Sequence, residues 1–235
     1  MSLQVAGNVL LKAVELDNKK RYTEALLYYK EGLQLLLDLL KGDVGDKRTS
    51  LRKKAEEYMK RAEEIKQIVE NLKQEGTFHE QIHIENNATG YSYEKVFGRF
   101  LDEDVEYVEI EDPYIRAYHQ CQNFVRFCEL LVKKCNKLRT IQLLTTADGT
   151  EQQKWLTDVT SSLAHHRIHL NISYSETLHD RQIKLSTGWI IKIGRGLDYF
   201  KAPETKFSLG VFETDFRTCH ETTIDIFHSN NVRNI

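Results

Sequence analysis

The amino-acid sequence predicts two domains of different class: an all-α three-helix bundle, followed by an α/β domain with a mixed sheet. From Val5 to about Lys73, apolar residues recur at spacings of three and four, which is the period of amphipathic helices. Beyond that stretch, short β-branched runs alternate with helical stretches, as is typical of an α/β domain. With 235 residues, 40% of them hydrophobic, the chain is long enough for one large domain or two ordinary ones with a substantial core.

The helical half divides into three segments, because the apolar period breaks at residues 18–21 and again at residues 42–46. Such short connections predict an antiparallel three-helix bundle. A polar run, NNATG, then separates the helical period from the β-branched runs. We therefore expect the bundle at residues 1–75, a linker at 76–90 and the second domain at 91–235.

The second half alternates strand-like and helix-like stretches. Alternation at these lengths implies βαβ units and a mostly parallel sheet, here finished by antiparallel strands near the C-terminus. The expected strands lie within residues 104–112, 139–145, 167–174, 181–186 and 189–193, and the expected helices at about 116–135 and 152–165.

Composition narrows the class of protein. The formal net charge of -2 argues against a general nucleic-acid coat. No run of apolar residues is long enough to span a bilayer, and four cysteines without an apolar leader predict a cytoplasmic protein. Cys121, Cys128 and Cys135 repeat every seven residues and are interpreted as packing thiols. The histidines lack acidic or thiol partners at a recognisable spacing, so we expect no metal and no cofactor.

Three segments of the helical half carry a family resemblance: KAVELD, RYTEALLYYKEGLQLL and LRKKAEEYMKRAEEIK. Together they resemble the MIT (microtubule-interacting and trafficking) domain. The resemblance implies binding of the helical C-terminal tails of ESCRT-III subunits, the charged multivesicular body proteins, between the second and third helices. The alternative is that Met59 belongs to the core and Glu63 is a solvated charge. The residues assigned to tail binding are Ala55, Met59, Ala62, Glu63 and Lys66.

A second motif is HDRQIKLSTGWIIKIGRG, from His179 to Gly196. His179 and Arg181 are two residues apart on a predicted strand, so we expect their side chains on the same face. The run Gly194-Arg195-Gly196 permits close approach of a ligand to the backbone. This order resembles the signature of the phospholipase D superfamily, in which a His-x-Lys pair, a downstream Asp and a Gly-Ser loop ending in Asn surround a phosphodiester.

This sequence departs from that signature at four positions and retains the histidine, His179. Arg181 replaces the lysine, and Ser186 stands at the aspartate position. Arg195 replaces the loop serine, and Asp198 corresponds to the closing asparagine. The departures argue against retained hydrolysis.

The superfamily's chemistry needs two histidines from two half-sites, and the chain holds one recognisable copy. His119 and His220 are not assigned as the second, because neither is followed by the basic residue and the hairpin. A homodimer would supply it. The rival hypothesis is therefore a homodimeric phospholipase D-type phosphodiesterase that uses His179 and Arg181 of each subunit.

What remains after the substitutions is a basic surface suited to phosphate or to an anionic membrane. Arginine binds phosphate through a bidentate fork, and a basic residue near acidic lipid contributes about 1 kcal/mol. Trp189, Tyr199 and Phe200 are candidates to enter a membrane interface. The alternative is that these aromatic residues pack in the core and the basic residues are ordinary surface charges. The residues assigned to phosphate or membrane binding are His179, Arg181, Lys184, Lys192, Arg195, Lys201 and Lys206.

Taken together, the two halves resemble a family of proteins in which an MIT domain precedes a degenerate phospholipase D-like domain. The resemblance implies a non-enzymatic adaptor that ESCRT-III tails recruit in cytokinesis and abscission. It also implies a homodimer that binds acidic phospholipid, including phosphoinositide, as a cytoplasmic peripheral membrane protein at the midbody and late endosome. A third possibility is a scaffold whose second domain only dimerises.

Overall fold

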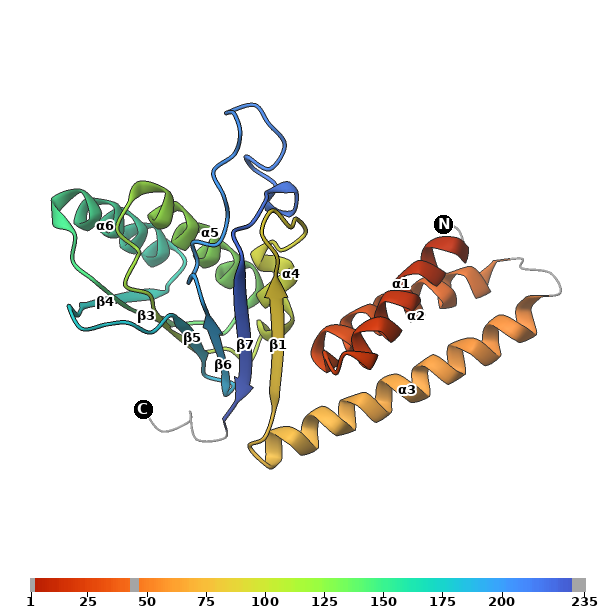
Figure 1. Ribbon diagram of the computed structural model, residues 1–235. Coiled ribbons are helices and arrows are strands. Elements are labelled where there is room, and N and C mark those ends of the chain that lie inside the picture. The colour runs from red at the N-terminus through yellow and green to blue at the C-terminus, as the bar shows by residue number, and fades with distance from the viewer. Residues whose placement is uncertain (1–2, 43–46, 230–235) are drawn as a thin grey trace. The chain divides into compact units, whose positions relative to one another are not determined.

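Figure 1 shows the computed structural model of the protein, which describes residues 3–42 and 47–229. The chain divides into two compact units, with the boundary between Glu80 and Gln81. The first unit is helical, and the second is built on a sheet with helices. The predicted fold class, an all-α three-helix bundle followed by an α/β domain with a mixed sheet, is confirmed.

The first unit consists of three helices, α1 (Leu3–Asn18), α2 (Tyr22–Lys41) and α3 (Arg48–Gln74). The first predicted break is confirmed, because α1 ends in a turn at which Lys20 adopts a positive φ of 57°. The backbone N–H of Arg21 bonds to the carbonyl of residue 16, which closes the helix end and reverses the chain. Most of the second predicted break, residues 43–46, lies outside the described residues. No helix in the described part of the chain is long and apolar enough to cross a membrane.

An apolar core and a partly buried ion pair hold the three helices together. Arg61 of α3 donates to both carboxylate oxygens of Asp17 in α1, with N–O distances of 2.8 and 2.9 Å. The ring of Tyr29 in α2 lies 6.0 Å from that of Tyr58 in α3, and burial beside Asp17 raises the pKa of Tyr29 to about 12. The most buried core residues are Ala6, Leu10, Ala13, Leu16, Ala25, Tyr29, Leu36 and Ile65.

The second unit is built on a seven-stranded sheet in the order β1-β7-β6-β5-β2-β3-β4. Helices α5 and α6 connect β2 to β3 and β3 to β4, and these three strands are parallel. From β2 through β5 and β6 to β7 the pairs are antiparallel, so the predicted mixed sheet is confirmed. The elements are β1 (His79–Ile84), α4 (Tyr93–Phe97), β2 (Tyr107–Glu111), α5 (Tyr118–Lys134), β3 (Thr140–Thr145), α6 (Gly149–His165), β4 (His169–Tyr174), β5 (Gln182–Leu185), β6 (Trp189–Ile193) and β7 (Thr222–His228).

Residue alternation gives the sheet one buried face and one polar face. Val108 pairs with Ile141 and Ile110 with Leu143 on the buried face, where each is at most 1% exposed. Because parallel crossovers are right-handed, α5 and α6 cover the same face of the sheet. The intervening residues form the other face, whose central strands carry a run of alternating charge. Its members include Glu109, Glu111, Lys184, Lys192 and Asp225.

The prediction of a linker at residues 76–90 is wrong in one respect, because this segment contains the strand β1. The strand reads HEQIHI, and its second, fourth and sixth residues, Glu80, Ile82 and Ile84, are buried. Its weak apolar pattern and the polar run that follows it hide the strand in the sequence. The C-terminal strand β7 and the short helix α4 were also not expected.

Candidate functional site

The first candidate site is a stripe of α3. Ile65 is fully buried in the bundle, whereas Met59 is 46% exposed. The hypothesis that Met59 is a core residue is therefore wrong, and its thioether is available on the surface. Glu63 and Lys66 are also exposed, Ala62 is half-buried and Ala55 is buried. The stripe thus runs from the edge of the core to solvent.

The second candidate site is the histidine motif, and here the structure corrects the expectation. The strand β5 begins at Gln182, so His179 and Arg181 precede the strand rather than lying in it. The argument that strand alternation places them on one face therefore fails. They nevertheless line one shallow hollow of about 290 Å³, together with Lys192, Gly194 and other residues. The ends of β5, β6 and β7 form this hollow.

Arg181 is committed to contacts within its own domain. Its Nη1 donates to the carbonyl oxygen of Gly194, and its guanidinium carbon lies 4.4 Å from the centre of the Tyr114 ring. Arg116 also lies over that ring, at 5.0 Å. A guanidinium stacked on an aromatic ring and bonded to a carbonyl has fewer N–H groups left for a phosphate. The contacts of Arg181 therefore connect the histidine motif to the glycine run at residues 194–196.

The glycine run closes over a buried carboxylate. Asp112, which is 3% exposed, accepts hydrogen bonds from the backbone N–H groups of Tyr114 at 3.0 Å and Leu197 at 3.1 Å. Gly196 has a positive φ of 62°, and a Cβ there would lie 2.0 Å from Oδ2 of Asp112. Burial raises the pKa of Asp112, although the two backbone donors and the charge of Arg181 act in the opposite direction. The close approach that the sequence predicted at this run is thus satisfied by Asp112.

A histidine–carboxylate pair lies beside this loop. The Oδ2 atom of Asp198 is 3.3 Å from Nε2 of His119, which lies in the first turn of α5. Gln120 and Asn123, on the same helix, each donate to Asp198 at 3.0 Å. The backbone N–H of Ala117 donates to Oε1 of Gln120, which fixes the orientation of that amide. Sequence reasoning missed this pair, and the only available signal was the spacing of His119, Gln120 and Asn123 on one helix.

The other basic residues that the sequence assigned to phosphate or membrane binding do not lie on one surface. Lys184 lies between Glu111 at 2.8 Å and Glu109 at 3.9 Å. Burial acts to raise the pKa of Glu111, but hydrogen bonds from Lys184 and Gln182 outweigh it and lower the pKa below its ordinary value. Lys201 donates to the side chain of Asn87 at 2.7 Å. Lys184 is therefore neutralised on the polar face of the sheet.

Arg195 and Lys201 belong to a different neighbourhood, next to His220. Burial lowers the pKa of His220, and the positive charges of Arg195 and Lys201 lower it further. Lys192 and Lys206 are exposed, and Lys192 shares the hollow with His179. The structure therefore groups His179, Arg181 and Lys192 at the hollow and leaves the other four cations outside it.

The aromatic candidates for membrane contact belong to the core, so that expectation is wrong. Tyr199 and Phe200 are 0% and 5% exposed. The hydroxyl of Tyr199 donates to the carbonyl of Tyr91 at 2.8 Å. Trp189 is half-buried, and the centre of its ring lies 4.8 Å from that of Phe100, with the two planes tilted by 55°. The alternative interpretation, that these side chains pack inside the domain, is correct.

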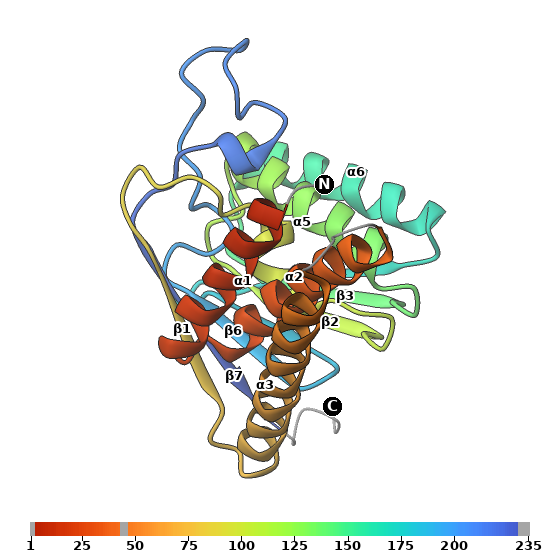
Figure 2. The same ribbon diagram turned by 90° about the vertical axis from the view of Figure 1, so that its right-hand side faces the viewer.

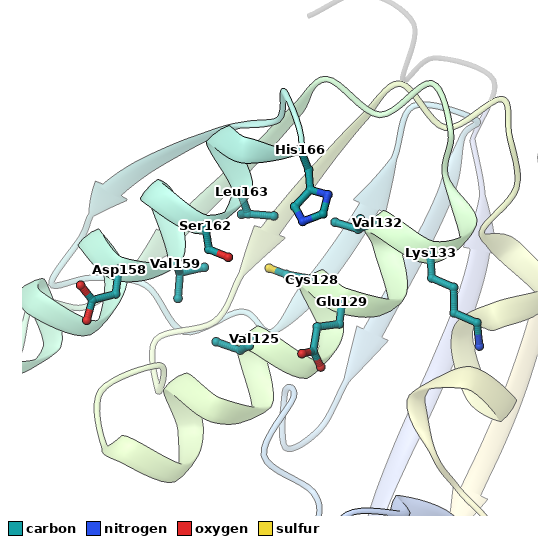
Figure 3. Close-up of a pocket in the computed structure, with 10 residues that line it drawn as sticks. All are labelled: Val125, Cys128, Glu129, Val132, Lys133, Asp158, Val159, Ser162, Leu163 and His166. Carbon is teal, nitrogen blue, oxygen red and sulfur yellow. The ribbon is translucent and has the colours of Figure 1, made fainter.

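A second hollow lies between α5 and α6, with a volume of about 470 Å³ (Figure 3). Its lining is mainly apolar, with Val125, Val132 and Leu163 among the residues, and Cys128 lies at its base. Figure 3 shows Asp158 toward one end and His166 at the other. The charged and titratable side chains at its rim are Glu129, Lys133, Asp158 and His166.

Across residues 3–42 and 47–229, no three His, Cys, Asp or Glu side chains are grouped as metal ligands would be. The four cysteines are buried and free. Burial raises the pKa of Cys121 and Cys219 to about 11 and that of Cys135 to about 12. These thiols are therefore protonated near neutral pH, and the interpretation of the helical three as packing residues is consistent with their environment.

Comparison with known proteins identifies both halves. The family model for the MIT (microtubule interacting and transport) domain matches residues 3–67, and the model described as a phospholipase D-like domain at the C-terminus of MIT matches residues 90–228. MIT domain-containing protein 1 of Mus musculus is 51% identical over 232 residues, which cover 97% of this chain and 93% of that protein. The chain therefore belongs to the MIT domain-containing protein 1 family, whose members carry an MIT domain followed by a phospholipase D-like domain.

Proposed function

We propose that the protein is a non-enzymatic adaptor associated with ESCRT-III in cytokinesis and abscission. In this proposal the MIT domain binds the helical C-terminal tails of ESCRT-III subunits, and the second domain forms a homodimer and contacts acidic phospholipid membranes. The protein would work at the cytoplasmic surface of membranes, at the midbody and the late endosome. Family membership supports this proposal, and the observation that carries it is the exposed Met59 stripe on α3.

The chemistry of the stripe supports the proposed tail binding. A helical ligand lays its apolar face into a groove between helices, and Met suits several related ligands because its side chain is flexible and polarizable. The small side chain of Ala62 permits a close helix–helix approach. Glu63 stands exposed at the rim, where it can pair with a ligand arginine.

The test is a titration of fluorescent ESCRT-III tail peptides into the full chain. We expect Met59→Asp to weaken binding by about tenfold or more, because a carboxylate replaces an apolar contact of at least 1.4 kcal/mol. Leu11→Asp is the matched control, since Leu11 is an apolar α1 residue that is 67% exposed. Equal affinity of the Met59 variant and the wild type would contradict the assignment.

Homodimer formation has a candidate surface in the groove between α5 and α6. In a two-fold dimer, each end of the groove meets the opposite end in the partner. The groove has Asp158 at one end and His166 at the other, so a second copy would place the imidazole of each His166 beside the carboxylate of the partner's Asp158 over the apolar floor. We expect Val132→Asp to lower the mass measured by light scattering to that of a monomer. An unchanged mass would exclude this surface.

The absence of hydrolysis is also part of the proposal. Arg181 is bonded to Gly194, and Lys184 is paired with two carboxylates, so neither is poised as the superfamily's lysine would be. The rival is a homodimeric phosphodiesterase that uses His179. Incubation with bis(p-nitrophenyl) phosphate and with labelled phospholipid distinguishes the two. Release of product that His179→Ala abolishes, but His169→Ala at another exposed site does not, would establish the enzyme.

A further inference from the structure

A loop of the second unit exposes large apolar side chains to solvent. The loop, residues 201–218, lies between β6 and β7 and is called here the apolar loop. Phe207 is 99% exposed and Phe212 is 93% exposed, while Leu209 and Phe216 are 82% and 58% exposed. Single exposed apolar residues are common on proteins, but a concentration of this kind marks a surface that contacts something else.

The apolar loop is held at its base. Phe200 and Cys219 form a β-bridge, and the backbone N–H of Lys201 donates to the carbonyl of Thr218 at 2.9 Å. At the side, Asp215 pairs with Lys95 of α4 at 3.0 Å. The loop therefore leaves the domain from a closed stem.

Arg217 braces the loop from within. Its side chain is 8% exposed, and it donates from Nε to the carbonyl of Gly210 and from Nη2 to that of Val211, both at 2.5 Å. Gly210 has a positive φ of 88°, and a Cβ there would lie 3.0 Å from the backbone of Arg217. The backbone that carries Leu209 and Phe212 is thus fixed on a buried guanidinium. Fixing the backbone in this way lowers the ordering cost of presenting these apolar side chains.

The tip of the loop is apolar rather than basic. From Lys206 to Phe212 the sequence reads KFSLGVF, in which Lys206 is the only charged residue. In both Figure 1 and Figure 2 the segment between β6 and β7, drawn in blue, extends beyond the ends of the strands. A stable protein interface needs about 800 Å² of contiguous surface on each partner. A bilayer needs no complementary face on a partner, because a fluid lipid surface accommodates a projecting tip of any outline.

We propose that the apolar loop inserts into the interfacial layer of a lipid bilayer, with Phe207, Leu209 and Phe212 entering between the lipids and Lys206 reaching the phosphates. This inference rests on the proposed membrane role and assigns it to a different surface from the histidine motif. Insertion of this kind is driven by apolar burial, so it depends weakly on salt and on lipid charge.

The experiment is flotation of the full chain with vesicles of phosphatidylcholine alone and of phosphatidylcholine with phosphatidylserine, at low and high salt. We expect the wild type to float with both kinds of vesicle. In a Phe207→Ser/Phe212→Ser variant, we expect the affinity for vesicles to fall by about tenfold or more for each phenylalanine replaced. Tyr174→Ser is the matched control, because Tyr174 is 43% exposed on β4 of the same unit. Tryptophan fluorescence checks that each variant folds.

A probe at the tip gives a second readout. The native cysteines are buried, so a single thiol introduced by Phe212→Cys can be labelled selectively with the environment-sensitive fluorophore NBD. We expect its emission to shift to the blue on addition of vesicles, and a label introduced by Tyr174→Cys to remain unchanged.

The outcomes separate the two proposals. Equal flotation of the double serine variant and the wild type, with no shift of the probe, would overturn insertion of the loop and leave membrane binding to another surface. No flotation of the wild type would overturn both. Loss of self-association in the double variant, with an unchanged probe on vesicles, would make the loop a protein contact and also overturn the inference.

Discussion

The contact between Gly196 and Asp112 gives a quantitative prediction for Gly196→Ala. A Cβ at position 196 would lie 2.0 Å from Oδ2 and 2.7 Å from Cγ of Asp112, which is too close for either atom to remain in place. Moving the carboxylate breaks the bond from the Leu197 N–H, which costs about 1.5–3 kcal/mol for a charged acceptor. The left-handed backbone adds about 1–2 kcal/mol for a residue with a side chain. We therefore expect a loss of about 2.5–5 kcal/mol in the free energy of unfolding of the second unit.

Urea denaturation followed by tryptophan fluorescence measures this loss, because Trp155 and Trp189, the only tryptophans in the chain, both lie in the second unit. Gly98→Ala is the control, since the nearest atom to its added Cβ is 3.7 Å away. A double-mutant cycle with Asp112→Ala isolates the clash, because removing the carboxylate should make Gly196→Ala much less costly. A loss below about 1 kcal/mol for Gly196→Ala would refute this account, since it is smaller than one such bond.

Three further predictions concern stability and thiol reactivity. Arg61→Ala leaves Asp17 partly buried without its cation, so we expect the free energy of unfolding of the helical unit to fall by about 1–3 kcal/mol. Circular dichroism during denaturation measures this change, and an unchanged free energy would mean that the pair does not stabilise the bundle. The pKa of Glu111 is lowered in the folded state, so its contribution is present above 4.5 and lost as the pH falls through the folded pKa. Lys184→Met should therefore flatten the acid limb of stability against pH, and an unchanged limb would contradict the pairing. Because the four thiols are buried, the native chain should react slowly with DTNB and release four equivalents in urea; fast native reaction would contradict their burial.

The sequence predicted those parts of the fold in which local pattern and tertiary environment agree. The helical period of residues 5–73 reflects one buried stripe per helix, and the runs at 139–145 and 189–193 became β3 and β6 because one face of each is buried. The strand β1 was missed because Glu80 occupies one of its three buried positions, which breaks the apolar pattern. The strand β7 was not among the expected strands, although its residues alternate regularly between buried and partly exposed positions.

The site could be predicted less well, because its contacts join residues that are distant in the chain. Leu197 bonds to Asp112 across 85 residues, and Gln120 bonds to Asp198 across 78. No local spacing encodes those pairs. The apolar loop was overlooked for a different reason. Phe207 and Phe212 are aromatic residues of a kind that usually packs in a core, and only their exposure in the structure distinguishes them from the buried Tyr199.

The two proposed contacts, tail binding by the MIT domain and bilayer insertion by the apolar loop, have a joint consequence because one chain carries both. When one contact is made, the second becomes intramolecular, with an effective concentration of about millimolar for a short connection. The two free energies then add on a membrane that displays ESCRT-III tails. If Met59→Asp lowers the tail affinity by about tenfold, it should lower binding to tail-coated vesicles by a similar factor. Adding Phe207→Ser/Phe212→Ser should multiply that loss. Vesicles that carry the tail peptides on a lipid anchor measure both losses in one assay. If the two contacts cannot be made at once, each single variant keeps the other contact and loses only about twofold in binding when the two contacts are equally strong, whereas the combined variant loses most of its binding. The adaptor would then join tails and membranes in alternation.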